Sequence, residues 1–229
     1  SSGTDRAKAP PRFKAIPIQT HILSERDDLV EVVRSYTDGV AEPGDIIAVA
    51  ESPVAITQGR AVLPQALKPG LLARLLSKLP NKDGSLGTPP AMQMALREAG
   101  TAKVLLGVLA GGFGRLIGRK GDFFRVAGRD LAQIDDIGGT LPPYDGYIVP
   151  GPEDPAAVAA AIKTATGIDA MVADVNDMKC VDILGITGDW DQKYLIDVLR
   201  DNPFGNEGQR TPIVILKAIQ GGHPRRQGQ

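Results

Sequence analysis

Apolar residues recur along the chain with two different spacings, which predict strands and helices in alternation. Alternating apolar and polar residues, or a short apolar run bounded by turn residues, indicate a strand. The clearest case is the run GDIIAVA after a Pro-Gly turn, whose continuous apolar character predicts a buried strand. The predicted strands are 13–18, 44–50, 147–150, 170–173 and 213–216.

Three further segments bear on these strands. We expect the second strand to continue through ESPVAITQ into a turn at Gly59 and Arg60. The segment FFRVA at 123–127 resembles a strand. The run KVLLGVLA at 103–110 is interrupted by Gly107, so it fits either a strand or a buried helix.

Apolar residues three and four positions apart predict helices, and cap residues mark their ends. Asp154 followed by Pro155 is a strong helix start, and Gly167 a stop. The helix at 69–79 is expected to bury a leucine stripe. The predicted helices are 27–36, 69–79, 88–100, 154–167 and 191–199, and the stripe is Leu72, Leu75, Leu76 and Leu79.

This alternation predicts a mixed α/β (α+β) architecture, with mixed sheets and packed helices and with some strand pairs antiparallel. No linker or repeat divides the chain, so we expect one domain over 13–217 with room for two sub-lobes. The polar ends, 1–12 and 218–229, are expected to be flexible tails.

Composition excludes several classes of protein. A hydrophobic fraction of 42% with 23% charged residues is typical of a folded globular chain. The net charge of −1 provides no overall field to attract nucleic acid or an anionic membrane, so neither partner is expected. A single cysteine, the absence of a signal-like segment and the absence of a run of ~20 apolar residues lead us to expect a cytoplasmic protein.

Two acidic runs are the main candidates for chemistry. The segment 121–155 has the glycine and proline content of a site loop and contains Asp130, followed by Asp135 and Asp136. The segment 173–182 contains Asp174, Asp177 and Asp182, and a carboxylate at the carboxyl end of a strand lies where open α/β sheets bind ligands. We expect the two runs to converge on a divalent metal and phosphate. The alternative is that these aspartates cap local backbone N–H groups.

The segment GGFGRLIGRKG at 111–121 is a candidate phosphate cradle. Backbone N–H groups freed by glycine can bind an anion, which Arg115, Arg119 and Lys120 could neutralise. The alternative is that the glycines allow close packing and the cations are solvated, because no GxxxxGK[ST] motif is present. The lone Cys180 is expected to be a small buried hydrophobe, and stacking or packing roles stay open for Tyr144 and Tyr147.

Five segments occur in the order and spacing of one known family. They are PGDIIAVAESPVAITQGR, GDFFRVAGRD, YIVPGPEDPAAVAAAIK, DAMVADVND and NEGQRTPIVILK. With these segments the chain resembles the coenzyme F-420 gamma-glutamyl ligase family over roughly 13–217. The resemblance implies a homodimer that uses GTP with magnesium or manganese to join L-glutamate, or a similar amino acid, to a small carboxylate acceptor. The implied route is an acyl phosphate made from the acceptor carboxylate, which the amine of the amino acid then attacks.

The resemblance also implies site residues. AGRD matches the family's metal aspartate at Asp130, and Asp174 matches the aspartate at the end of the later strand. Both are therefore expected in the catalytic and metal site, with Glu207 as a third metal ligand. The expected nucleotide-binding residues are Gly59, Arg60, Arg115, Arg119, Lys120 and Lys179.

Two departures from the family pattern bear on activity. The family's Ser-Lys-Ala-Glu-Gly-Arg is Ala55–Ile56–Thr57–Gln58–Gly59–Arg60 here, and its Asp-Thr-x-Gly-Arg is represented by 174–178, followed by Lys179. A triphosphate needs positive charge around it, and this second motif supplies only Lys179. Two hypotheses therefore stay open: a nucleotide-driven ligase, and a non-catalytic paralogue that serves as a dimeric ligand-binding or scaffold protein.

Overall fold

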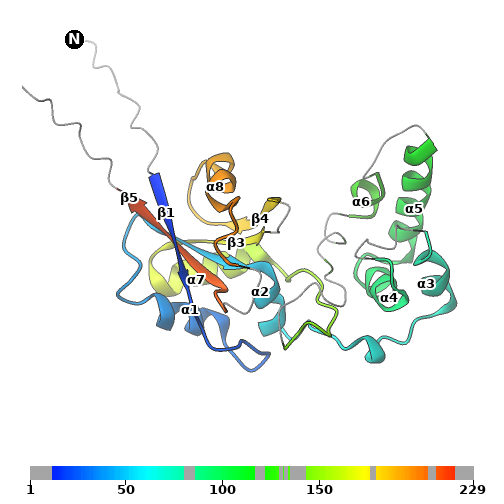
Figure 1. Ribbon diagram of the computed structural model, residues 1–229, viewed down its shortest axis with the longest axis horizontal. Helices are drawn as coiled ribbons and strands as arrows, with labels where there is room; N and C mark the ends of the chain where they lie inside the picture. Colours follow the sequence, from blue (N-terminus) through cyan, green and yellow to red (C-terminus); the bar gives the residue numbers. More distant parts are fainter. Residues whose placement is uncertain are drawn as a thin grey trace, which may run out of the picture.

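The computed structural model describes residues 12–79, 86–116, 122–128, 131, 134, 143–175, 179–205 and 210–219. These residues form a sheet lobe and a helical lobe (Figure 1). The sheet lobe contains both ends of the described chain, and the helical lobe is built from the middle of the sequence.

The sheet lobe is organised around one five-stranded mixed sheet. Its order is β1-β5-β2-β3-β4, in which β2 and β3 are parallel and the other neighbours are antiparallel. This confirms the expected mixed architecture and adds β4, which the sequence patterns did not predict. The strands are β1 (Arg12–Ile18), β2 (Ile46–Ala50), β3 (Asp169–Val175), β4 (Val181–Ile186) and β5 (Ile213–Ile219).

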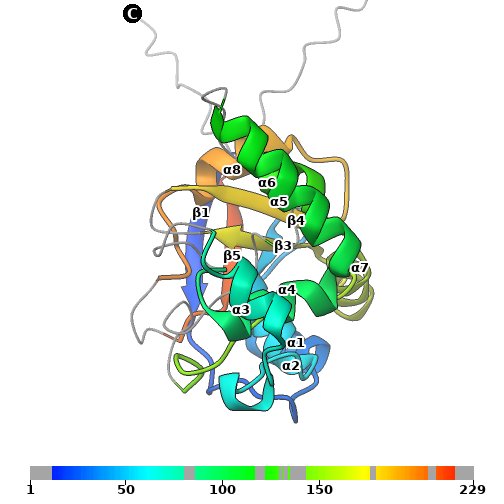
Figure 2. The same cartoon turned by 90° about the vertical axis from the view of Figure 1, so that its right-hand side faces the viewer.

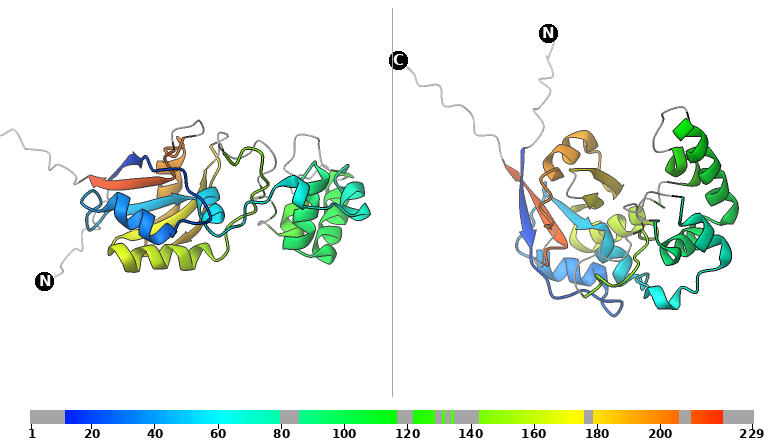
Figure 3. Two further views of the ribbon diagram at one scale, coloured as in Figure 1. Left: turned by 90° about the horizontal axis from the view of Figure 1, so that it is seen from below. Right: turned by 45° about the vertical axis from the view of Figure 1, so that its right-hand side comes forward.

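Helices cover both faces of this sheet (Figure 3). On one face α1 (Leu29–Thr37) and α7 (Pro155–Thr166) pack against Ile47, Val49 and Val172. On the other face α8 (Gln192–Leu199) packs against strand residues such as Ala48. The central strand β2 is buried from both sides, as its apolar run predicted.

An aspartate network fixes the start of β3. The Asp169 carboxylate accepts hydrogen bonds from Thr187 Oγ1 (2.8 Å) and Trp190 Nε1 (3.1 Å), and Lys163 Nζ lies 2.7 Å away. Burial of this carboxyl favours its neutral form, but these three contacts outweigh burial and lower its pKa from the ordinary value. Asp169 therefore ties β3 to α7 and to the segment after β4.

The helical lobe packs α3 (Leu71–Leu76), α4 (Pro89–Glu98), α5 (Thr101–Leu116) and α6 (Asp122–Ala127) around a core of its own (Figure 2). Glycines allow α5 to approach α6 closely. A Cβ added to Gly107 would lie 2.6 Å from Ala127 Cβ, and one added to Gly111 would lie 3.1 Å from Phe123 Cβ. Only a residue without a side chain fits at Gly107.

Two chain segments connect the lobes. On the outward path α2 (Glu51–Thr57) leads past Gly59 and Arg60 to the short 3-10 helix η1 (Pro64–Ala66), and on the return path 143–150 leads to α7. The segments meet at one antiparallel bridge between Val62 and Ile148, at the position of the short strand predicted at 147–150.

Several predicted elements differ from the observed ones. Residues 51–57 form the helix α2, because β2 loses its β5 partner after Val49 and Pro53, which cannot donate to a strand ladder, is tolerated in a first helical turn. FFRVA lies in α6, where Phe123 and Ala127 face α5, and 103–110 is part of the helix α5.

The leucine stripe of α3 is only partly buried. Leu76 is 5% exposed, whereas Leu75 is 63% and Leu79 50% exposed. The buried face of α3 instead includes Ala73, so the helix packs with a rotation that the leucine pattern did not predict.

Candidate functional site

The carboxyl ends of β2 and β3 place two acidic residues at the same sheet edge. Ala50 of β2 pairs with Ala173 of β3 in parallel register, so Glu51 and Asp174 follow at neighbouring positions. Glu51 begins α2 and is buried, at 7% exposure, and Asp174 is half-buried. The edge of parallel strands is where α/β sheets bind ligands.

A second carboxylate lies opposite Asp174. Asp182 of β4 is its antiparallel register partner, so both side chains project from the same face of the sheet. Burial raises the pKa of Asp174, and the negative charge of Asp182 raises it further. A cation or a shared proton would relieve the repulsion between these carboxylates.

The donor chemistry of this pair fits a hard divalent cation. Magnesium and manganese favour carboxylate and water oxygens, and Mg²⁺ keeps several waters when only one or two carboxylates bind it. Within the described ranges, no three His, Cys, Asp or Glu side chains are grouped to hold a metal. The other expected ligands, Asp130 and Glu207, lie outside those ranges.

Several further candidates also fall outside the described residues, whereas three of the expected cations, Arg60, Arg115 and Lys179, lie within the described ranges. Arg115 belongs to the last turn of α5. Lys179 has a left-handed backbone (φ 61°), and its Nζ lies 3.3 Å from Asp201 Oδ1. The candidates that lie outside the described residues are Asp135, Asp136, Asp177, Arg119 and Lys120.

Arg60 is the centre of an interlobe network. Its Nε donates to the Gly151 carbonyl at 2.8 Å, and its guanidinium forms ion pairs with Glu98 of α4 and with Glu153. Gln58 adds two hydrogen bonds to the backbone of Glu153, at 2.8 and 2.9 Å. The side chain of Arg60 is only 14% exposed, so its contacts hold the two connecting segments and α4 together.

The glycine-rich segment is helical where the structure describes it. Gly111, Gly112 and Gly114 lie within α5, and Gly111 packs on Phe123 of α6. Close packing therefore accounts for this part of the motif better than an anion-binding loop does. The remaining glycines of the motif, Gly118 and Gly121, lie outside the described ranges.

Three other candidates are placed clearly. Cys180 is exposed, so the prediction that it is a buried hydrophobe is wrong; it sits just before β4, at a sheet edge instead of a core position. Tyr144 and Tyr147 pack edge to face with ring centroids 5.2 Å apart, beside Val149 and Ile56, which supports their packing role.

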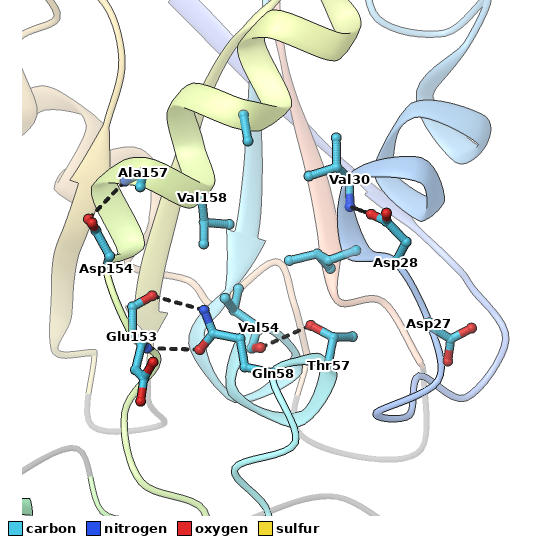
Figure 4. Close-up of a pocket in the computed structure, with 12 residues that line it drawn as sticks. Asp27, Asp28, Val30, Val54, Thr57, Gln58, Glu153, Asp154, Ala157 and Val158 are labelled. Carbon is cyan, nitrogen blue, oxygen red and sulfur yellow. Dashed lines mark hydrogen bonds between the residues drawn. The ribbon is translucent and has the colours of Figure 1, made fainter.

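A pocket of about 510 Å³ opens beside the start of two helices (Figure 4). Asp28 caps α1 by accepting from Val30 N at 3.0 Å, and Asp154 caps α7 by accepting from Ala157 N at 3.1 Å. Asp27 and Glu153 complete an acidic rim, and the remaining lining is mainly apolar. The sequence marked Asp154 as a cap, but only the fold brings the two helix starts together. The lining residues are Asp27, Asp28, Leu29, Val30, Val54, Thr57, Gln58, Glu153, Asp154, Ala157, Val158 and Ala161.

A family model described as F420-0:Gamma-glutamyl ligase matches residues 17–174. The chain belongs to this family. The match covers well over half of the sequence, both lobes included, and ends at Asp174. No curated protein matches the chain. No described helix of this F420-0:gamma-glutamyl ligase family member has the length and apolar character to cross a membrane.

Proposed function

We propose that the chain is a metal-dependent, nucleotide-driven amide ligase that joins an amino acid such as L-glutamate to a small carboxylate acceptor. The proposal rests on membership in a gamma-glutamyl ligase family and on the half-buried Asp174 beside Asp182, at the carboxyl end of a strand, where open α/β sheets commonly bind ligands. The same resemblance supports GTP as the nucleotide and a homodimer as the assembly.

The proposed chemistry has two steps. The acceptor carboxylate attacks the γ-phosphorus of GTP, which gives an acyl phosphate and GDP. The amine of the amino acid then attacks the acyl carbon, so that an amide bond forms and phosphate leaves. Bound Mg²⁺ or Mn²⁺ would neutralise phosphate charge in such a site.

Each proposed role belongs to a residue type that can perform it. Asp174 would hold the metal, together with Asp130 and Glu207 from the expected set. Arg115, Arg119, Lys120 and Lys179 would place positive charge around the phosphates, and the turn of Gly59 and Arg60 would position the segment next to them. No histidine or serine nucleophile is needed, because phosphoryl transfer depends mainly on positioning and charge neutralisation.

The metal assignment is tested by titrating Mn²⁺ with electron paramagnetic resonance. We expect Asp174→Asn to weaken Mn²⁺ binding several-fold, because the variant loses an anionic oxygen ligand. Asp38→Asn, at the exposed end of α1, is the matched control and should bind like the parent chain. Unchanged Mn²⁺ affinity in Asp174→Asn would refute the assignment.

A non-catalytic paralogue is the second candidate, and the Arg60 network favours it. A guanidinium already held by two carboxylates has less capacity to bind phosphate. Calorimetric titration with GTP, ATP and GDP, with and without magnesium or manganese, separates the two functions. Heat of binding for GTP with metal supports the ligase, and no nucleotide binding in any mixture supports the paralogue.

A further inference from the structure

The net charge of −1 conceals a strong division of charge between the lobes. Residues 64–134, which contain the helices of the helical lobe and most of its core, carry eleven Lys and Arg against four Asp and Glu, a formal charge of +7. The rest of the chain therefore carries −8. The net charge of the whole chain therefore does not predict what either lobe attracts, because the field of a charge extends only about 8–10 Å at ordinary salt concentrations.

An apolar face of α5 is exposed on this basic lobe. Leu106, Leu109 and Phe113 are 57%, 70% and 65% exposed, and Leu105 is 38% exposed. At 100° per residue these side chains lie on one side of the helix, roughly opposite Gly107. Since Gly107 packs against α6, the apolar face points away from α6.

A mixed apolar and basic face lies along α3 and the turn that follows it. Leu71, Leu75 and Leu79 are 85%, 63% and 50% exposed and recur every four residues. Arg74 and Lys78 are exposed on the same side, at the same four-residue interval. Leucines beside long cationic side chains are typical of helices that lie in a lipid interface.

Both helices lie on the side of the helical lobe that is remote from the sheet lobe (Figures 1 and 2). We propose that this side, formed by the exposed faces of α3 and α5, docks on an anionic lipid surface. The leucines and Phe113 would enter the headgroup region, and the basic side chains would contact lipid phosphates. With 16 residues α5 is too short to span a bilayer of about 30 Å, so it would lie in the plane of the surface.

Charge favours this occupant over a second copy of the chain. A two-fold interface through this side would bring two +7 lobes together, and their repulsion opposes that contact. Nucleic acid would match the charge but not a face centred on Leu109 and Phe113.

The test is co-sedimentation of the full chain with two kinds of vesicle. One kind is phosphatidylcholine alone, and the other is an equimolar mixture of phosphatidylcholine and phosphatidylglycerol. We expect binding to the anionic vesicles, weakened by added salt, and at least tenfold weaker partition for a Leu109→Gln, Phe113→Gln double variant. The matched control, Ile22→Gln with Ile219→Gln, alters two sheet-lobe side chains, each 48% exposed, and should bind normally.

A charge variant tests the basic part of the surface. Arg74→Glu with Lys78→Glu should abolish the preference for anionic vesicles, whereas Lys14→Glu with Lys193→Glu, on the sheet lobe, should keep it. Circular dichroism verifies that each variant is folded. Equal binding to both kinds of vesicle, or no effect of the Leu109 and Phe113 changes, would overturn the proposal. So would a dimer in sedimentation velocity that the same two changes dissociate, because the face would then be a self-interface.

Discussion

Replacing Gly107 by alanine should loosen the contact between α5 and α6. In an exposed helix, replacing glycine by alanine stabilises the folded state by about 1 kcal/mol, because the unfolded chain has more conformational entropy with glycine than with alanine. At Gly107, however, the new Cβ would lie 2.6 Å from Ala127 Cβ and 3.0 Å from the Phe123 carbonyl oxygen. Neither atom can rotate away, so an overpacking cost of about 3 kcal/mol outweighs the gain and leaves a net loss of about 2 kcal/mol.

Neighbouring glycines of the same helix provide the controls. A Cβ at Gly112 would meet nothing within 4 Å, so Gly112→Ala should stabilise by about 0.5–1 kcal/mol. At Gly111 the added Cβ would lie 3.1 Å from Phe123 Cβ, so the effect of Gly111→Ala on stability should fall between those of Gly107→Ala and Gly112→Ala.

Urea denaturation followed by far-UV circular dichroism, which reports the helices of both lobes, measures these changes. Fluorescence of Trp190, the only tryptophan, reports separately on the sheet lobe. If Gly107→Ala stabilised the protein as much as Gly112→Ala, α5 would not pack on α6 through its glycines.

Two further predictions concern the charged networks. Arg60→Met should lower the free energy of unfolding by about 2 kcal/mol, because it leaves Glu98 and the half-buried Gly151 carbonyl without their partner. Arg34→Met, in an exposed ion pair, should have a much smaller effect in the same urea titration. Equal effects of the two changes would show that the Arg60 network contributes no more than a surface pair. The lowered pKa of Asp169 stabilises the fold above the unfolded pKa of about 3.9, and this contribution is lost as the pH falls through the folded value. Between pH 7 and pH 2 the melting temperature should therefore fall less for Asp169→Asn than for the parent chain. Melting temperatures that fall in parallel for the two proteins would contradict this.

Local interactions explain what the sequence predicted well. Caps at Thr88, Asp154 and Asp191 begin α4, α7 and α8, because a side-chain oxygen satisfies backbone N–H groups only two or three residues away. The unbroken apolar run of β2 likewise indicates burial on both faces, whatever packs there.

Contacts between distant segments decided the rest. The end of β2 depends on where β5 begins, so no local pattern could show that 51–57 turns into a helix. The glycines of α5 resembled an anion-binding loop until the position of α6 was known, because glycine serves loops and close helix contacts equally well.

The candidate site shows the same division. The sequence identified Asp174 as a carboxylate at a strand end, but its register partner Asp182 belongs to β4, a strand that no sequence pattern predicted. The sequence also contains the charges of both lobes, yet their net value of −1 describes neither one. Residue types and helix caps can be read from the sequence, because they depend on neighbouring residues. Only the tertiary structure decides which carboxylates, cations and leucines share a surface, because that depends on packing between distant segments.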